Sequence, residues 1–88
     1  MGNQVEFIAG PNGKISPSGI KNIETSPVYV TFTANEGYRI DKVYFNGALS
    51  FSGEQIKNGV IWHYESTKAA YWIRKPSVIK VTFIEHSN

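Results

Sequence analysis

Apolar and polar residues alternate along three stretches of the chain, as they do in strands that bury one face. Residues 28–34 (VYVTFTA) alternate throughout, and residues 42–45 and 79–83 repeat the pattern. A strand has a side-chain period of two, so each stretch is predicted to be a strand with one inward face. The residues expected to be buried are Val30, Phe32, Val43, Phe45, Val81 and Phe83, and those expected to face outward are Thr31, Thr33, Lys80 and Thr82.

Three Asn-Gly pairs lie between strand-like segments, at residues 12–13, 46–47 and 58–59. Asn-Gly is suited to the type I′ turn of a two-residue hairpin, so three hairpins are predicted. The four prolines are expected at turns or directly before strands, where a missing N–H does not interrupt a ladder. We expect Pro27 and Pro76 to precede the two clearest strands.

Helix signals are weak. Residues 52–57 begin with a capping Ser, but an Asn-Gly pair follows at once, and residues 65–70 could form a single turn. Neither segment is long enough for a stable helix. The predicted fold is therefore all-β, a small antiparallel sandwich or half-open barrel of hairpins.

The length of 88 residues predicts a single domain over residues 1–88. The absence of cysteine excludes disulfides, thiolate metal sites and cysteine nucleophiles. No apolar run approaches the ~20 residues of a membrane span, and the N-terminus has no signal-peptide pattern. If the protein is exported, its signal is expected to lie outside this segment.

The order of these elements resembles the divergent InlB B-repeat family of bacterial surface and secreted proteins. Residues 7–19 resemble its opening strand and Gly-Gly-x-hydrophobic-x-Pro-x-Gly element, with Asn12-Gly13 in place of the two glycines. Residues 30–34 resemble its Val-Thr-Phe-Thr-Ala strand, and residues 37–47 its Gly-Tyr segment that ends in Asn-Gly. Residues 79–83 resemble its last strand, so the resemblance covers most of residues 5–83.

The chain departs from the family pattern between residues 50 and 77, where it is longer and rich in aromatic residues. The resemblance implies an extracellular or cell-surface repeat, spacer or adhesion module without catalytic activity, excised from a longer protein. It also implies a structural alternative, a β-grasp-like fold with one short helix in the longer segment.

Catalytic and metal-binding residues are sparse, with two histidines, one aspartate and six glutamates spread along the chain. No spacing suggests an acid–base pair or three clustered ligands, so we expect no enzyme, metal or cofactor. The net charge of +2 comes from scattered basic residues interleaved with acids, which argues against nucleic acid as a partner.

The segment 62–75 holds the candidate binding residues, because exposed aromatics beside basic groups suit carbohydrate or protein ligands. For Trp62, packing in the core is favoured over a ligand platform. Tyr71 and Trp72 are adjacent and must point to opposite faces of a strand, so one of them is expected to be exposed. The candidate ligand-binding residues are Trp62, Tyr71, Trp72, Arg74 and Lys75.

Overall fold

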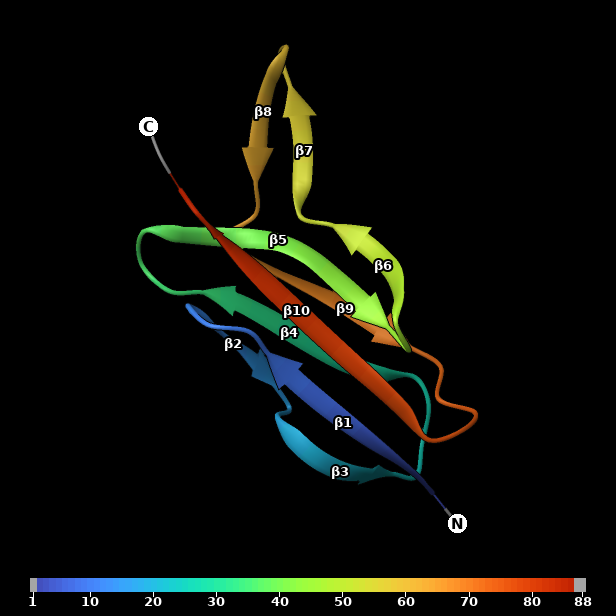
Figure 1. The fold of residues 1–88 in the computed structure, drawn as a ribbon. Coiled ribbons are helices and arrows are strands. Elements are labelled where there is room, and N and C mark those ends of the chain that lie inside the picture. Colours follow the sequence, from blue (N-terminus) through green and yellow to red (C-terminus); the bar gives the residue numbers. More distant parts are fainter. Residues whose placement is uncertain (1, 87–88) are drawn as a thin grey trace.

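The computed structural model describes residues 2–86, which form ten β-strands and no helix (Figure 1). In chain order these are β1 (Asn3–Ala9), β2 (Gly13–Ser16), β3 (Gly19–Ile23), β4 (Val28–Ala34), β5 (Tyr38–Phe45), β6 (Ala48–Ser52), β7 (Glu54–Lys57), β8 (Val60–His63), β9 (Ser66–Tyr71) and β10 (Ser77–Glu85). The all-β prediction is confirmed.

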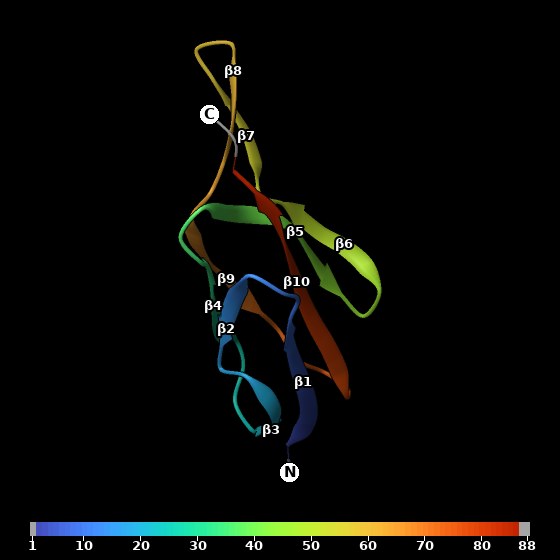
Figure 2. The same cartoon turned by 60° about the vertical axis from the view of Figure 1, so that its left-hand side comes forward.

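The strands form two facing sheets and one separate hairpin. Sheet A has five strands in the order β3-β1-β10-β5-β6, and sheet B has three in the order β2-β4-β9. Figures 1 and 2 show the two sheets stacked as layers, while the β7–β8 hairpin projects beyond one end of them. The arrangement is a sandwich and not a closed barrel.

The core lies between the two sheets and is built from alternate residues of their central strands. Val30 and Phe32 from β4 meet Val43 from β5, and all three are fully buried. Phe32 packs edge to face on Phe51, with 5.9 Å between ring centroids, which ties sheet B to sheet A. The core residues are Val5, Phe7, Ile15, Val30, Phe32, Ile40, Val43, Tyr71, Ile73, Ile79 and Val81.

Most of the predicted pattern of inward and outward residues is confirmed. Val81 is fully buried and Lys80 is exposed, whereas Phe45 and Phe83 are only partly buried against the core. The three threonines predicted to face outward are partly covered. Tyr38 is more than half buried at the start of β5.

Two of the three predicted Asn-Gly hairpins are present, and the third prediction is wrong. The pairs at 46–47 and 58–59 connect β5 to β6 and β7 to β8, with positive φ at all four residues. At residues 12–13 only Asn12 has positive φ, and Pro11 precedes it, which is the pattern of a type II turn. The chain there passes from sheet A to sheet B, so β1 and β2 are not paired.

The segments considered for helices are strands, so the alternative with a short helix is wrong. Residues 52–57 lead into β7, which the Asn58-Gly59 turn folds onto β8, and residues 65–70 largely coincide with β9. β9 takes six register pairs with β4, and these pairs outweigh the weak helical tendency of a one-turn segment.

One strand pair differs from the antiparallel prediction. β1 runs parallel to β10 through five consecutive register pairs, from Val5 with Ser77 to Ala9 with Val81. Because both strands point the same way, the chain enters sheet A at one end of the molecule and leaves it at the other (Figure 1). The molecule measures 47 × 23 × 18 Å along its principal axes.

Gly53 joins the projecting hairpin to sheet A. Its N–H donates to the Asp41 carbonyl at 2.8 Å, and its carbonyl accepts from the Tyr64 N–H at 3.0 Å. The Tyr64 carbonyl in turn accepts from the Ile40 N–H at 2.8 Å. These backbone bonds fix both ends of the hairpin to β5.

Candidate functional site

The structure separates the five candidate residues into two places. Trp62 lies on β8 in the projecting hairpin, whereas Tyr71 ends β9 and residues 72–75 follow it at the opposite end of the sandwich (Figure 1). The candidate segment therefore contributes to two separate surfaces.

The first place is a hollow of about 320 Å³ beside Trp72, which we call the Trp72 pocket. Trp72 is 60% exposed, whereas its neighbour Tyr71 is 8% exposed, so the prediction that one of the pair faces solvent is confirmed. Arg74 and Lys75 flank the hollow and are both exposed. Its lining residues are Phe45, Asn46, Trp72, Arg74, Lys75 and Ser77.

Tyr71 supports this pocket from inside the core and does not form its surface. Its ring stacks on Phe45 with 5.2 Å between centroids, and its hydroxyl lies 2.8 Å from the Ser50 hydroxyl. Burial raises the pKa of Tyr71 above its ordinary value, and the hydrogen bond to Ser50 opposes part of that effect. Its ring is therefore not available to a ligand in this conformation.

Hydrogen bonds to Ser26, in the loop between β3 and β4, hold the loop that carries Trp72. The Ile73 N–H donates to the Ser26 hydroxyl at 3.0 Å, and Ile73 itself is buried. Since Ile73 points into the core, its neighbours Trp72 and Arg74 are directed toward solvent.

The other side of the pocket is fixed by Asn46, in the turn between β5 and β6. Its side-chain amide donates to the Ser77 hydroxyl at 3.3 Å, and its side-chain oxygen accepts from the Val78 N–H at 2.8 Å. The Ser77 hydroxyl donates to the Lys75 carbonyl at 2.8 Å. The pocket is thus held between two anchored turns, which lowers the entropy that a ligand must overcome on binding.

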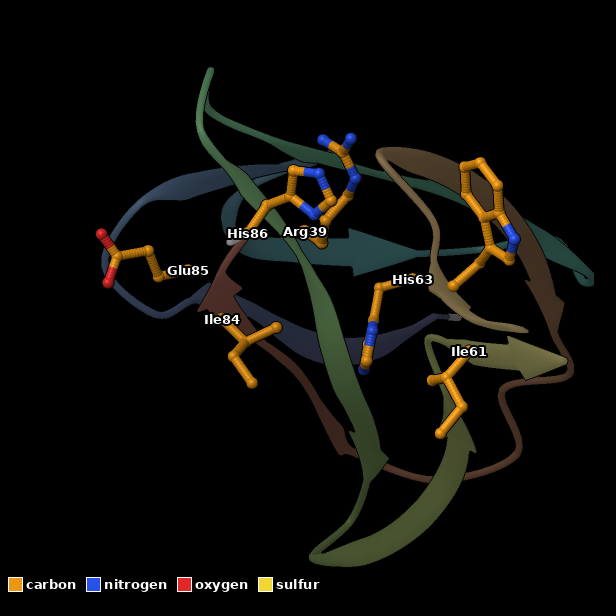
Figure 3. A pocket seen from close by; sticks show the side chains of 7 residues that line it. Arg39, Ile61, His63, Ile84, Glu85 and His86 are labelled. Atoms are coloured by element: carbon orange, nitrogen blue, oxygen red, sulfur yellow. The ribbon is translucent and has the colours of Figure 1, made fainter. Parts of the chain in front are cut away.

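The second place is a cleft of about 250 Å³ between the hairpin and the end of β10, which we call the Trp62 cleft (Figure 3). Figure 3 shows the side chains of Arg39, His63 and His86 around this space, with the Glu85 carboxylate pointing away from them. The lining residues are Arg39, Ile61, Trp62, His63, Ile84, Glu85 and His86.

The expectation that Trp62 packs in the core is wrong, because its ring is 49% exposed. The hairpin belongs to neither sheet, so no second layer covers it. Ile56, Val60 and Ile61 on the same hairpin are each more than half exposed.

Arg39, on the wall of the Trp62 cleft, is engaged within the molecule. Its guanidinium lies 3.3 Å from a carboxylate oxygen of Glu65 and donates to the Tyr38 carbonyl at 3.3 Å. A ligand in the cleft would compete with both contacts.

Sequence reasoning missed Phe45, Asn46 and Ser77 in the Trp72 pocket. It also missed Arg39 and His86 in the Trp62 cleft. Except for Ser77, which lies two residues beyond the candidate segment, these residues come from strands or turns distant from it in sequence. No local pattern indicates that β5 and β10 lie beside it.

Within residues 2–86, no group of three or more His, Asp or Glu side chains is arranged to hold a metal ion. The same residues include no helix that is long and apolar enough to cross a membrane. No protein-family model, curated protein or solved structure matches this chain.

Proposed function

We propose that this chain is a non-catalytic β module that serves as a repeat or spacer unit of a bacterial surface or secreted protein. The observation that carries the proposal is the parallel pairing of β1 and β10. It places the entry and the exit of the chain at opposite ends of the sandwich (Figure 1).

This geometry suits a unit in an extended array. Copies linked head to tail through such ends add length, whereas ends on the same side would fold copies back on one another. The molecule is elongated, at 47 × 23 × 18 Å, and the projecting hairpin contributes to its long axis.

The resemblance to the InlB B-repeat family supports a bacterial and extracellular setting. The match lies in the order of the strand and turn segments over most of residues 5–83. A chain without cysteine has no disulfide that depends on the redox state of its compartment, which is compatible with export.

Small-angle scattering on one, two and three copies joined head to tail tests the spacer proposal. The maximum dimension should grow with each added copy by the span from entry to exit, roughly 30 Å at ~3.3 Å per residue from the start of β1 to the end of β10. Growth much smaller than this, with copies packed side by side, would contradict the proposal.

A second candidate function is adhesion through the Trp72 pocket, with a carbohydrate or a protein as the ligand. Trp72 presents a flat apolar ring at 60% exposure, beside the charged Arg74 and Lys75. Rings of this kind stack on the apolar face of a sugar or on a partner's side chain, and the two cations favour an acidic ligand.

Glycan arrays and pull-downs test this candidate, with Trp72→Ala as the variant and Trp62→Ala as the matched control. Binding should be lost in Trp72→Ala and retained in Trp62→Ala, with both melting temperatures close to that of the parent chain. Loss of binding only in Trp62→Ala would assign the ligand to the Trp62 cleft, and absence of binding in the parent would end the adhesion candidate.

A further inference from the structure

We infer that the β1–β10 pair acts as a mechanical clamp that bears tension applied between the two ends of the module. The inference deepens the proposed spacer function and rests on it, because a unit in an extended surface array transmits tension along the chain. The clamp consists of β1, β10 and the strands that flank them.

Tension between the ends loads this pair in shear. β1 would be drawn toward its N-terminal end and β10 toward its C-terminal end, and the two strands lie side by side. All five register pairs, Val5–Ser77 to Ala9–Val81, then carry the load together. Strands pulled apart from one end would instead lose these pairs one after another.

The side chains on the inner face of the pair resist sliding. Val5 and Phe7 from β1 and Ile79 and Val81 from β10 are 0–3% exposed, and they interlock with the rest of the core. Their burial also shields the inner face of the ladder from water that could replace its hydrogen bonds. Sliding by one residue would turn these apolar side chains toward solvent.

Both strands of the clamp are also held on their outer sides. β3 takes five antiparallel register pairs with β1, from Asn3–Ile23 to Phe7–Gly19. β5 takes seven pairs with β10, from Ile79–Phe45 to Glu85–Tyr38. The load therefore enters the middle of a five-stranded sheet, where neither strand is an edge that can peel away.

The direct path of the load bypasses most of the chain. It passes from β1 to β10 across the sheet, so residues 10–76 are not stretched while the clamp holds. The β7–β8 hairpin and most of the Trp72 pocket belong to this sheltered segment. A ligand bound there would remain in place under tension.

Single-molecule force spectroscopy on the whole chain tests the clamp. The chain has no cysteine, so an introduced cysteine gives a unique point of attachment. Pulling between the two termini loads the clamp in shear, whereas pulling between the N-terminus and Lys75→Cys opens the pair from its Val5–Ser77 end. Terminal pulling should need a higher unfolding force, by up to about fivefold, because five pairs share the load. Equal forces in the two directions would overturn the inference.

A cross-link within the clamp provides a second test. Glu6 and Val78 are exposed register partners, so Glu6→Cys with Val78→Cys places a disulfide directly across the pair. In the reduced form, unfolding should lengthen the span from Asn3 to Glu85 to roughly 270–300 Å at ~3.3–3.6 Å per residue. In the oxidised form the span should stay near roughly 40 Å, the length of the extended end segments, and the high-force event should disappear.

The matched control is a disulfide across the β7–β8 hairpin, from Ile56→Cys and Ile61→Cys, which are also exposed register partners. This hairpin lies outside the load path, so the unfolding force should not change. A rise in force with the hairpin cross-link, or an unchanged event with the Glu6–Val78 cross-link, would overturn the clamp. Neither result tests the spacer proposal, which the scattering measurement tests. The clamp and the spacer proposal can therefore fail separately.

Discussion

Gly53 occupies a position where no side chain fits, and Gly53→Ala should loosen the junction between the hairpin and sheet A. The residue is buried, and a methyl group at its Cα would overlap the Ile40 carbonyl. The obstacle is backbone that hydrogen bonds hold in place, not the end of a flexible side chain.

The expected fall in the free energy of unfolding has two sources: the overlap of the added methyl group and the weakening of nearby backbone hydrogen bonds. Forcing an extra methyl group into a packed site costs about 1–3 kcal/mol. The three backbone bonds that link Gly53, Tyr64, Ile40 and Asp41 contribute about 0.5–1.5 kcal/mol each, and a shift of the hairpin would weaken them together. The free energy of unfolding should therefore fall by about 2–4 kcal/mol, and the melting temperature by roughly 8–30 °C for a domain of this size.

Chemical denaturation measures the total fall in the free energy of unfolding. Amide hydrogen exchange shows which part of the molecule is destabilised. The Ile40 and Tyr64 amides should exchange faster in Gly53→Ala. The control is Gly59→Ala at the hairpin tip, where the methyl meets no atom within 4 Å but φ is +76°. It should cost about 1–2 kcal/mol through backbone strain and leave those two amides protected. A Gly53→Ala protein within about 0.5 kcal/mol of the parent would refute the reasoning.

Two tyrosines give further predictions. Tyr38→Ala removes a ring that is more than half buried, so it should lower the free energy of unfolding by about 2–3 kcal/mol in chemical denaturation; a change within about 0.5 kcal/mol would place the ring on the surface. The raised pKa of Tyr71 means that the folded state holds this proton more tightly than the unfolded state, so its contribution is complete below pH 10 and declines as pH rises above it. Stability measured upward from pH 10 should therefore fall more steeply in the parent than in Tyr71→Phe, and identical slopes would contradict the assignment.

The parts of the fold that are visible in the sequence are those that depend on neighbouring residues. Alternation in β4 and β10 predicts which face is buried, because a strand has a period of two whatever its partners are. The turns at Asn46 and Asn58 follow equally from local φ preferences. At residues 12–13 the same dipeptide follows Pro11, and that difference marks a turn between sheets.

Local sequence patterns do not specify which distant strands pair or which side chains stay exposed. The parallel pairing of β1 with β10 joins strands from opposite ends of the chain, and no local pattern specifies it. Trp62 has the pattern of a buried strand residue, but its hairpin projects beyond both sheets and leaves the ring exposed. The Trp72 pocket likewise depends on Asn46, which only the folded chain brings beside Trp72.

The distance between Gln4 and Glu85 tests the parallel pairing on which the account rests. Both residues are exposed near the outer ends of β1 and β10, and Gln4→Cys with Glu85→Cys allows spin labelling in a chain without other cysteines. With Val5 beside Ser77, a rise of ~3.3 Å per residue places the two backbones roughly 30 Å apart. Pulsed electron–electron double resonance should find a narrow distribution near that value, widened only by the labels. A backbone separation of about 5 Å, as between direct partners of an antiparallel pair, would contradict the account.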